Sequence, residues 1–170
     1  MNQKNTKIVL ITGAGKRLGE ATALKLHSLG MDIIIHYNSS EKGAKDLVSK
    51  MNDVRKNSAI SIKLDLRDFI SYEKEFSKLD EKWSSIDVLI NNASTFYSDD
   101  LEINEGSNWN DLINSNVKAP YYLVSNFKDE LKKNYGSIVN ITDAMVIRGM
   151  EKFPIYSIAK GGLETITKSL

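Results

Sequence analysis

The sequence predicts an α/β fold built on a doubly wound, Rossmann-like parallel sheet. Three observations carry this prediction. Five apolar, β-branched runs alternate with helical patterns, which is typical of βαβ units. The runs are mostly continuous rather than alternating, as expected for strands that are covered on both faces. Right-handed crossovers between them favour the strand order 3-2-1-4-5.

The expected strands and helices follow one another regularly along the chain. The strands are KIVLIT (7–12), DIIIHY (32–37), AISIKLDL (59–66), DVLINNA (87–93) and GSIVNIT (136–142). The helical patterns occupy 17–29, 41–56, 68–83, 109–133 and 155–170. Gly30 is a stop signal for the first helix, and Pro120 lies in the middle of the fourth.

The last helical pattern runs to Leu170 without a Gly, a Pro or a polar cap. The fifth strand would then be an uncovered, apolar sheet edge, which is an aggregation liability. We therefore expect the chain to be truncated before the last strands of the sheet. The alternative is a short domain whose edge is covered by a partner.

Composition limits the classes of protein to consider. The 170 residues predict one domain over 1–170, and 41% hydrophobic and 26% charged residues are ordinary for a globular protein. A net charge of +1 gives no argument for nucleic acid or an anionic membrane. With no bilayer-spanning run and no signal peptide, we expect a cytoplasmic protein. The absence of Cys and the separation of His27 from His36 argue against a metal centre.

A Gly-rich turn, ITGAGKRLGEA (11–21), connects the first strand to the first helix. Backbone N–H groups and the helix dipole can bind a pyrophosphate at such a turn. Gly13 can take the tight turn, and Gly19 allows close helix packing. The alternative is a plain turn, but its place after the first strand of a βαβ unit favours nucleotide binding.

The end of the second strand indicates which dinucleotide is bound. An NAD site usually carries an acidic residue there for the ribose hydroxyls. This chain has HYNSS (36–40) and no carboxylate before Glu41, while Lys16 supplies a cation. Those groups suit the 2′-phosphate of NADP(H). The same segment can also cap the next helix through a serine.

Tyr156 and Lys160, in YSIAK, are separated by one helical turn and therefore share one face of a helix. A nearby cation favours the phenolate, so we expect Lys160 to lower the pKa of Tyr156 and make it a better acid. Asp143 follows the fifth strand, at the rim where open α/β sheets bind ligands. We expect 13–19, 91–94 and Asp143 to surround one crevice on that rim. The alternative is an exposed helical Tyr and Lys without function.

With TGAGKRLG (12–19), NNAS (91–94), Asn116 and YSIAK (156–160), the chain resembles the short-chain dehydrogenase/reductase family over essentially its whole length. Within that family it is most similar to the pteridine reductases. Arg17 replaces the usual middle Gly of TGxxxGxG, and Asp143 replaces the usual catalytic Ser. Both departures point to the pteridine reductases.

The resemblance implies catalytic roles for four residues. Tyr156 would donate or relay the proton, and Lys160 would lower its pKa and hold the nicotinamide ribose. Asp143 would act beside the tyrosine on the pterin ring nitrogens. Asn116 would help to anchor a water relay to the lysine.

Binding roles follow in the same way. Ser94 would hydrogen-bond the flat substrate, Phe96 would stack on it, and Arg17 would contact both cofactor phosphate and pterin. Phe96 could instead pack in the core, and Arg17 could be a solvated cation, although its place at a helix start disfavours that. The implied cofactor contacts, with Asp65 and Leu66 at the adenine, are Gly13, Lys16, Arg17, Leu18, Gly19, His36, Tyr37, Asn38, Ser39, Ser40, Asp65, Leu66, Asn92, Ala93 and Lys160.

The sequence therefore predicts an NADPH-dependent reductase of pterins, with biopterin, dihydrobiopterin and dihydrofolate as candidate substrates. A general carbonyl or 3-ketoacyl reductase of the same family is the first alternative. A non-catalytic dinucleotide-binding fragment is the second. The resemblance also implies a homo-oligomer, a dimer or a tetramer, assembled through the helices at 109–133 and 155–170.

Overall fold

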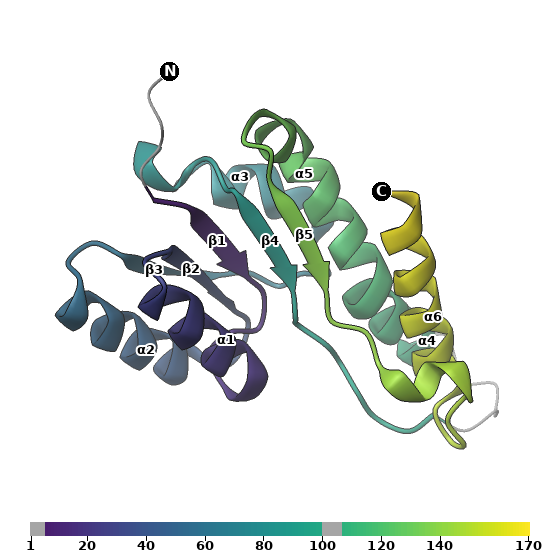
Figure 1. The fold of residues 1–170 in the computed structure, drawn as a ribbon. Coiled ribbons are helices and arrows are strands. Elements are labelled where there is room, and N and C mark those ends of the chain that lie inside the picture. Colours follow the sequence, from purple (N-terminus) through teal and green to yellow (C-terminus); the bar gives the residue numbers. More distant parts are fainter. Residues whose placement is uncertain (1–5, 100–106) are drawn as a thin grey trace.

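A computed structural model of the chain describes residues 6–99 and 107–170, which form a layered α/β fold (Figure 1). In these residues a single parallel sheet has the order β3-β2-β1-β4-β5. Its strands are β1 (Ile8–Ile11), β2 (Asp32–Tyr37), β3 (Ala59–Lys63), β4 (Val88–Asn91) and β5 (Ser137–Asn140). The predicted fold class and strand order are confirmed.

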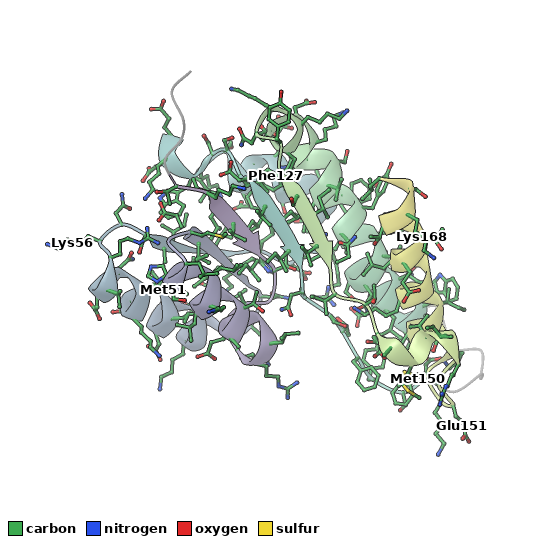
Figure 2. All side chains as sticks on the ribbon, viewed as in Figure 1. Met51, Lys56, Phe127, Met150, Glu151 and Lys168 are labelled. Atoms are coloured by element: carbon green, nitrogen blue, oxygen red, sulfur yellow. The ribbon has the colours of Figure 1, made fainter. Side chains whose placement is uncertain are left out.

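Helices lie on both faces of the sheet, as the doubly wound prediction requires (Figure 1). They are α1 (Arg17–Ser28), α2 (Glu41–Val54), α3 (Tyr72–Phe76), α4 (Ser107–Ile113), α5 (Ala119–Lys133) and α6 (Pro154–Ser169). Successive strand residues point to opposite faces, so Val9 packs with α1 and α2 while Leu10 packs with α3 and α5. Figure 2 shows Met51 of α2 and Phe127 of α5 on opposite sides of the sheet.

The prediction of coverage on both faces holds for the central strands, and the fifth strand lies at a sheet edge and is incompletely covered, as expected. All residues of β1 and β2 are buried. β5 forms one edge of the sheet, and its burial alternates, with Val139 44% exposed. Only one face of β5 is covered, because α5 and α6 pack there and α1 and α2 do not extend so far.

Two predicted helices are interrupted. The helix expected at 68–83 is reduced to α3, with 3-10 turns at Phe69–Ser71 and Glu81–Trp83. Side chains there bond to nearby backbone carbonyls, as when the Ser77 hydroxyl donates to Lys74 O, and such bonds compete with helix continuation.

The helix expected at 109–133 is instead α4 and α5, joined by a π-helical turn at Asn114–Lys118. Pro120, expected in mid-helix, lies in the first turn of α5. Proline has no N–H, so the carbonyl of Asn116 receives no i+4 hydrogen bond, and the ladder adjusts before it. The turn places the buried Asn116 beside the loop that follows β4.

The loops after β1, β4 and β5 open along the same edge of the sheet, as expected for parallel strands (Figure 1). Backbone hydrogen bonds connect them, from Thr12 N to Ile90 O and from Ile141 N to Asn91 O. In the described parts of the chain, no helix has the length and apolar character needed to cross a membrane.

Candidate active site

The Gly-rich turn fits closely against the loop after β4, and two of its glycines have no room for a side chain. Gly13 has a φ of 62°, and a Cβ there would lie 2.9 Å from Ala93 Cα. A Cβ on Gly19 would lie 2.7 Å from Ala14 Cα and 2.7 Å from Asn92 Nδ2. Real Cβ atoms essentially never approach so closely. The turn is therefore a cradle of main chain packed tightly against the loop after β4, and its place between β1 and the start of α1 suits a phosphate.

Side-chain hydrogen bonds hold this cradle in place. The Thr12 hydroxyl oxygen accepts from the backbone N–H groups of Asn92 and Ala93, each at 2.9 Å. The Asn92 amide donates to Thr12 O at 2.8 Å and to Gly13 O at 3.2 Å. The loops after β1 and β4 thus form one rigid unit.

His36 supports the cradle from below and is 2% exposed. Its Nδ1 accepts from Gly13 N–H at 3.1 Å, while Nε2 lies 2.9 Å from Leu64 O and must donate to it. This arrangement requires the neutral ring with its proton on Nε2. Burial lowers the pKa of His36 to about 4. His36 therefore acts as a neutral structural element, which the sequence did not reveal.

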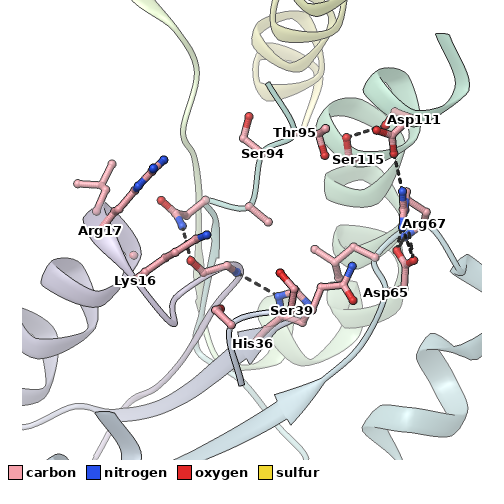
Figure 3. A pocket seen from close by; sticks show the side chains of 18 residues that line it. Lys16, Arg17, His36, Ser39, Asp65, Arg67, Ser94, Thr95, Asp111 and Ser115 are labelled. Carbon is pink, nitrogen blue, oxygen red and sulfur yellow. Dashed lines mark hydrogen bonds and ion pairs between the residues drawn. The ribbon is translucent and has the colours of Figure 1, made fainter. Parts of the chain in front are cut away.

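A cavity of about 470 Å³ lies over the cradle (Figure 3). Lys16 and Arg17 stand on one side of it, and Arg67 with its carboxylate partners stands on the other (Figure 3). Its lining contains every predicted cofactor residue except Tyr37 and Lys160, together with Ser94. The sequence did not identify four further lining residues, Arg67, Thr95, Asp111 and Ser115.

Tyr37, which was expected at the adenosine end, does not line the cavity. Its side chain is 5% exposed and packs in the core with α1 and α2. Neighbouring strand residues point to opposite faces, so His36 and Asn38 reach the cavity while Tyr37 cannot. The alternation of the strand could have shown this from the sequence.

Arg17, which stands where the wider family has a glycine, adopts a left-handed backbone with a φ of 54°. That conformation is unfavourable for a residue with a side chain and concentrates at functional sites. Arg17 also lines the cavity at the start of α1. The backbone at Arg17 thus has a left-handed conformation that a glycine would adopt without strain, and the arginine side chain adds a cation.

Tyr156 and Asp143 meet as predicted, beyond the lining of the cavity. The Tyr156 hydroxyl donates to Asp143 Oδ2 at 3.1 Å, from α6 to the segment after β5. Burial, followed by the Asp143 carboxylate, raises the pKa of Tyr156 to about 12, although the Ser94 hydroxyl acts in the opposite direction. Lys160 is not among the groups that shift this pKa here, and the lowering expected from it stays a prediction. Tyr156 is a protonated donor at neutral pH.

Lys160 is 2% exposed and lies on the same face of α6 as Tyr156. Its Nζ donates to Ile141 O at 2.9 Å and lies 5.8 Å from the centre of the Tyr156 ring. Burial lowers the pKa of Lys160, and Asp143 opposes that shift. The lysine thus fastens α6 to the end of β5.

Asn116 and Ser94 connect the cavity to the tyrosine. The Ser94 hydroxyl donates to Asn116 Oδ1 at 2.7 Å. The Asn116 amide donates to Thr95 O at 2.9 Å and to Leu112 O at 3.0 Å. These bonds direct the side chain of Asn116 to the loop after β4 rather than to Lys160. Its predicted part in a water relay stays a prediction.

Phe96 is exposed at 53%, which excludes the alternative of core packing. Its ring stacks on Phe153, with centroids 4.6 Å apart and planes at 4°, and meets Tyr156 edge to face at 4.8 Å. A partly exposed aromatic ring thus lies against the ring of Tyr156. Phe153 was missed because nothing in its spacing marks it as a partner of Phe96.

A model of the family described as short chain dehydrogenase matches residues 7–170. This chain belongs to the short-chain dehydrogenase family. The family prediction is thereby confirmed, and it implies a nicotinamide dinucleotide as the cofactor.

Several curated short-chain dehydrogenases are similar to the chain. It is 32% identical to pteridine reductase 1 of Leishmania tarentolae over 95% of this chain and 69% of that protein. It is 30% identical to the 3-oxoacyl-(acyl-carrier-protein) reductase of Buchnera aphidicola, over 98% and 66%. A hydroxynaphthalene reductase-like protein of Metarhizium anisopliae is 27% identical, over 96% and 61%. The chain spans about two thirds of the length of these relatives.

Proposed function

We propose that the protein is an NADPH-dependent reductase of pterins, with dihydrofolate among its candidate substrates. One observation carries the proposal. The Tyr156 hydroxyl is bonded to Asp143, and the Tyr156 ring contacts the half-exposed ring of Phe96. A proton donor, an acidic partner and an aromatic platform suit a flat nitrogen heterocycle. The similarity to a pteridine reductase supports it.

The chemistry of a C=N bond fits this set of groups. Its reduction needs a hydride at carbon, which the nicotinamide supplies when bound, and a proton at nitrogen. With its pKa raised, Tyr156 holds that proton at neutral pH. The Asp143 carboxylate orients the hydroxyl and can accept an N–H of the heterocycle. Lys160 keeps a buried amine beside the tyrosine, where it would hold the nicotinamide ribose.

The residues of the cavity fit a phosphorylated dinucleotide. Gly13 and Gly19 line the cavity at the start of α1, where backbone N–H groups can bind the pyrophosphate. Lys16, Ser39 and Ser40 line the cavity near the end of β2, where no carboxylate is present before Glu41. A cation with hydroxyl donors suits the 2′-phosphate of NADP(H) better than the free ribose hydroxyls of NAD(H).

Phe96 gives the substrate its platform. Offset stacking of two flat rings is favourable by about 0.5–1.5 kcal/mol beyond the area that it buries. Phe153 occupies one face of Phe96, so a pterin must displace it or use the remaining exposed surface. Ser94 lies between this surface and the cavity, where its hydroxyl can contact the substrate.

A substrate panel tests the proposal. The full-length protein is given NADPH with dihydrobiopterin, dihydrofolate or a simple β-ketoester, and NADPH oxidation is followed by absorbance. Turnover of the pterin with little turnover of the ketoester is expected. Turnover of the ketoester alone would keep the family and remove the pterin assignment.

An Asp143→Ser variant sharpens the same test. Serine can polarise a ketone but lacks the carboxylate that orients the Tyr156 hydroxyl and accepts a ring N–H, so pterin reduction should fall by about 100-fold. Any ketoester activity should fall much less. Equal losses on both substrates would count against a pterin-specific role for Asp143.

The first alternative is a 3-ketoacyl or general carbonyl reductase, favoured by the 30% identity to a 3-oxoacyl reductase. Asp143 in place of serine and the exposed Phe96 argue against it. The second alternative is a dinucleotide-binding protein without activity. NADPH binding by calorimetry with no reduction of any substrate in the panel would establish it.

Self-association is part of the proposal. The exposed residues Tyr121 on α5 (53%) and Ile158 on α6 (54%) give these helices apolar surface suited to a homo-oligomer. Light scattering of the full-length protein should give the mass of a dimer or tetramer. A monomer at micromolar concentration would contradict this part.

A further inference from the structure

Arg67 is held between two carboxylates on the wall of the cavity opposite Lys16 and Arg17 (Figure 3). Its Nε and Nη2 donate to Asp65 at 2.9 Å and 2.6 Å, and its Nη1 donates to Asp111 at 2.6 Å. Asp65 follows β3, whereas Asp111 belongs to α4. The guanidinium therefore connects two elements that are distant in the sequence.

This connection is more restrained than an ordinary surface ion pair. Asp65 is bonded by two nitrogens of the guanidinium, and the Arg67 backbone N–H donates to the same carboxylate at 3.0 Å. Tyr97 Oη donates to Asp111 at 3.0 Å and fixes the second carboxylate. Guanidinium hydrogen bonds lie in its plane, so the two carboxylates set the orientation of that plane. What the group can still offer a ligand is largely its flat face.

The local charge decides which part of a dinucleotide can lie there. One cation, Arg67, stands between two carboxylates, so the cluster carries a net negative charge and disfavours a phosphate. In the described part of the chain no carboxylate pairs with Lys16 or Arg17, which remain available for phosphates. An uncharged, flat group is the ligand that suits the guanidinium face.

We propose that Arg67 binds the base of the dinucleotide by stacking its guanidinium on the adenine, and that Asp111 is a positioning residue that holds the guanidinium plane in a fixed orientation. This inference rests on the proposed function. It changes the expected role of Asp65, whose carboxylate oxygens both accept from Arg67. Asp65 then supports the platform, and Leu66 lines the cavity next to it.

The test compares Arg67→Lys with Arg148→Lys, a matched change at an exposed arginine outside the cavity. Lysine keeps the charge and loses the plane. Arg67→Lys should raise the Kd of NADPH and of NADH by the same factor, about tenfold, because the base is common to both. Nicotinamide mononucleotide, which has no adenine, should bind with unchanged affinity. Arg148→Lys should change none of the three.

Asp111→Asn tests the positioning role, since the amide keeps an acceptor for Tyr97 and loses the ion pair. It should raise the KM of both dinucleotides by about threefold and leave kcat unchanged. A fall in kcat at constant KM would overturn the positioning role.

The other outcomes separate the two proposals. A loss confined to NADPH would show that Arg67 contacts the 2′-phosphate, and a loss with the mononucleotide would show general distortion; either overturns the stacking role. Unchanged affinities for both dinucleotides in Arg67→Lys would overturn it too. If the unsubstituted protein binds neither dinucleotide, the proposed function is wrong and this inference falls with it.

Discussion

The two ends of the site are built in different ways. At the nucleotide end, the shape of the Gly-rich turn is set by buried main chain and by hydrogen bonds to it. Thr12 and His36 make these bonds, and Gly13 packs against the loop after β4. At the catalytic end, Asp143 and the Tyr156 hydroxyl come from separate segments beside an edge strand, and the neighbouring Ile147 is 87% exposed. The first end is part of the fold, whereas the second is assembled on its rim.

This difference separates two kinds of substitution. Changes in the buried nucleotide end should affect stability and cofactor binding together, because the same contacts serve both. Changes at the catalytic end should affect turnover while sparing stability and cofactor binding. The predictions below test that separation, beginning with the largest expected effect.

Tyr156→Phe should lower kcat by about 10³-fold, because it removes the proton donor and keeps the ring that packs against Phe96. Only the hydroxyl bonded to Asp143 is lost. Steady-state kinetics with dihydrobiopterin and calorimetry with NADPH check the two halves. Retained turnover would contradict the catalytic assignment. A comparable loss of NADPH affinity would show that the catalytic end also contributes to cofactor binding, contrary to the proposed difference between the two ends.

Acid should destabilise the nucleotide end through His36. Its pKa is about 4 when folded and ordinarily 6.5, so the unfolded chain binds more protons between these values. Stability is then full above about pH 6.5 and is lost as the pH falls toward 4, by about 3 kcal/mol. Urea unfolding at pH 7 and at pH 4.5 measures this loss.

His36→Asn is the matched control, since asparagine has both a donor and an acceptor and does not titrate in this range. Its unfolding free energy should fall less steeply with acid. The lowered pKa of His27 contributes in the same direction in both proteins and therefore cancels. An identical pH dependence in the two proteins would show that His36 is not the responsible group.

The difference between the nucleotide end and the catalytic end also explains which features could be predicted from the sequence. Strand order and the glycines follow from local pattern and chain connectivity, so Gly13, Gly19 and the parallel sheet were found. The pairing of Tyr156 with Asp143 came from spacing and resemblance.

What was missed depends on side chains that meet only after folding. Arg67 reaches Asp111 across the cavity, and Phe153 stacks on Phe96 from a distant segment. Neither pair has a spacing that a helix or strand would reveal. The raised pKa of Tyr156 could not be predicted for the same reason, because it depends on burial and on the contact with the Asp143 carboxylate.

Asn38→Asp should shift the ratio of NADPH to NADH affinity by about tenfold toward NADH, since a carboxylate repels the 2′-phosphate and accepts from free ribose hydroxyls. Asn38 lines the cavity directly after β2. Lys63→Gln, at a mostly exposed position on β3 outside the cavity lining, is the control for a general change of charge. A constant ratio would remove the 2′-phosphate from this position.

Arg17→Gly should produce the smallest effect of these substitutions. It tests whether stability and cofactor binding change together at the nucleotide end. A non-glycine residue in the left-handed region is strained, and relief by glycine is partly offset by backbone entropy, for a net gain of about 0.5–1 kcal/mol. NADPH binding should weaken in the same variant, because a cation that lines the cavity is lost. Urea unfolding and calorimetry measure the two changes.

Tyr135→Gly is the matched change, because Tyr135 has a φ of 49°, is 95% exposed and lies outside the cavity lining. It should give a similar gain in stability with no change in NADPH affinity. If Arg17→Gly also leaves affinity unchanged, the strain at Arg17 has no part in binding. A loss of affinity at Arg17 alone would show that the residue in this strained backbone position is kept for the ligand.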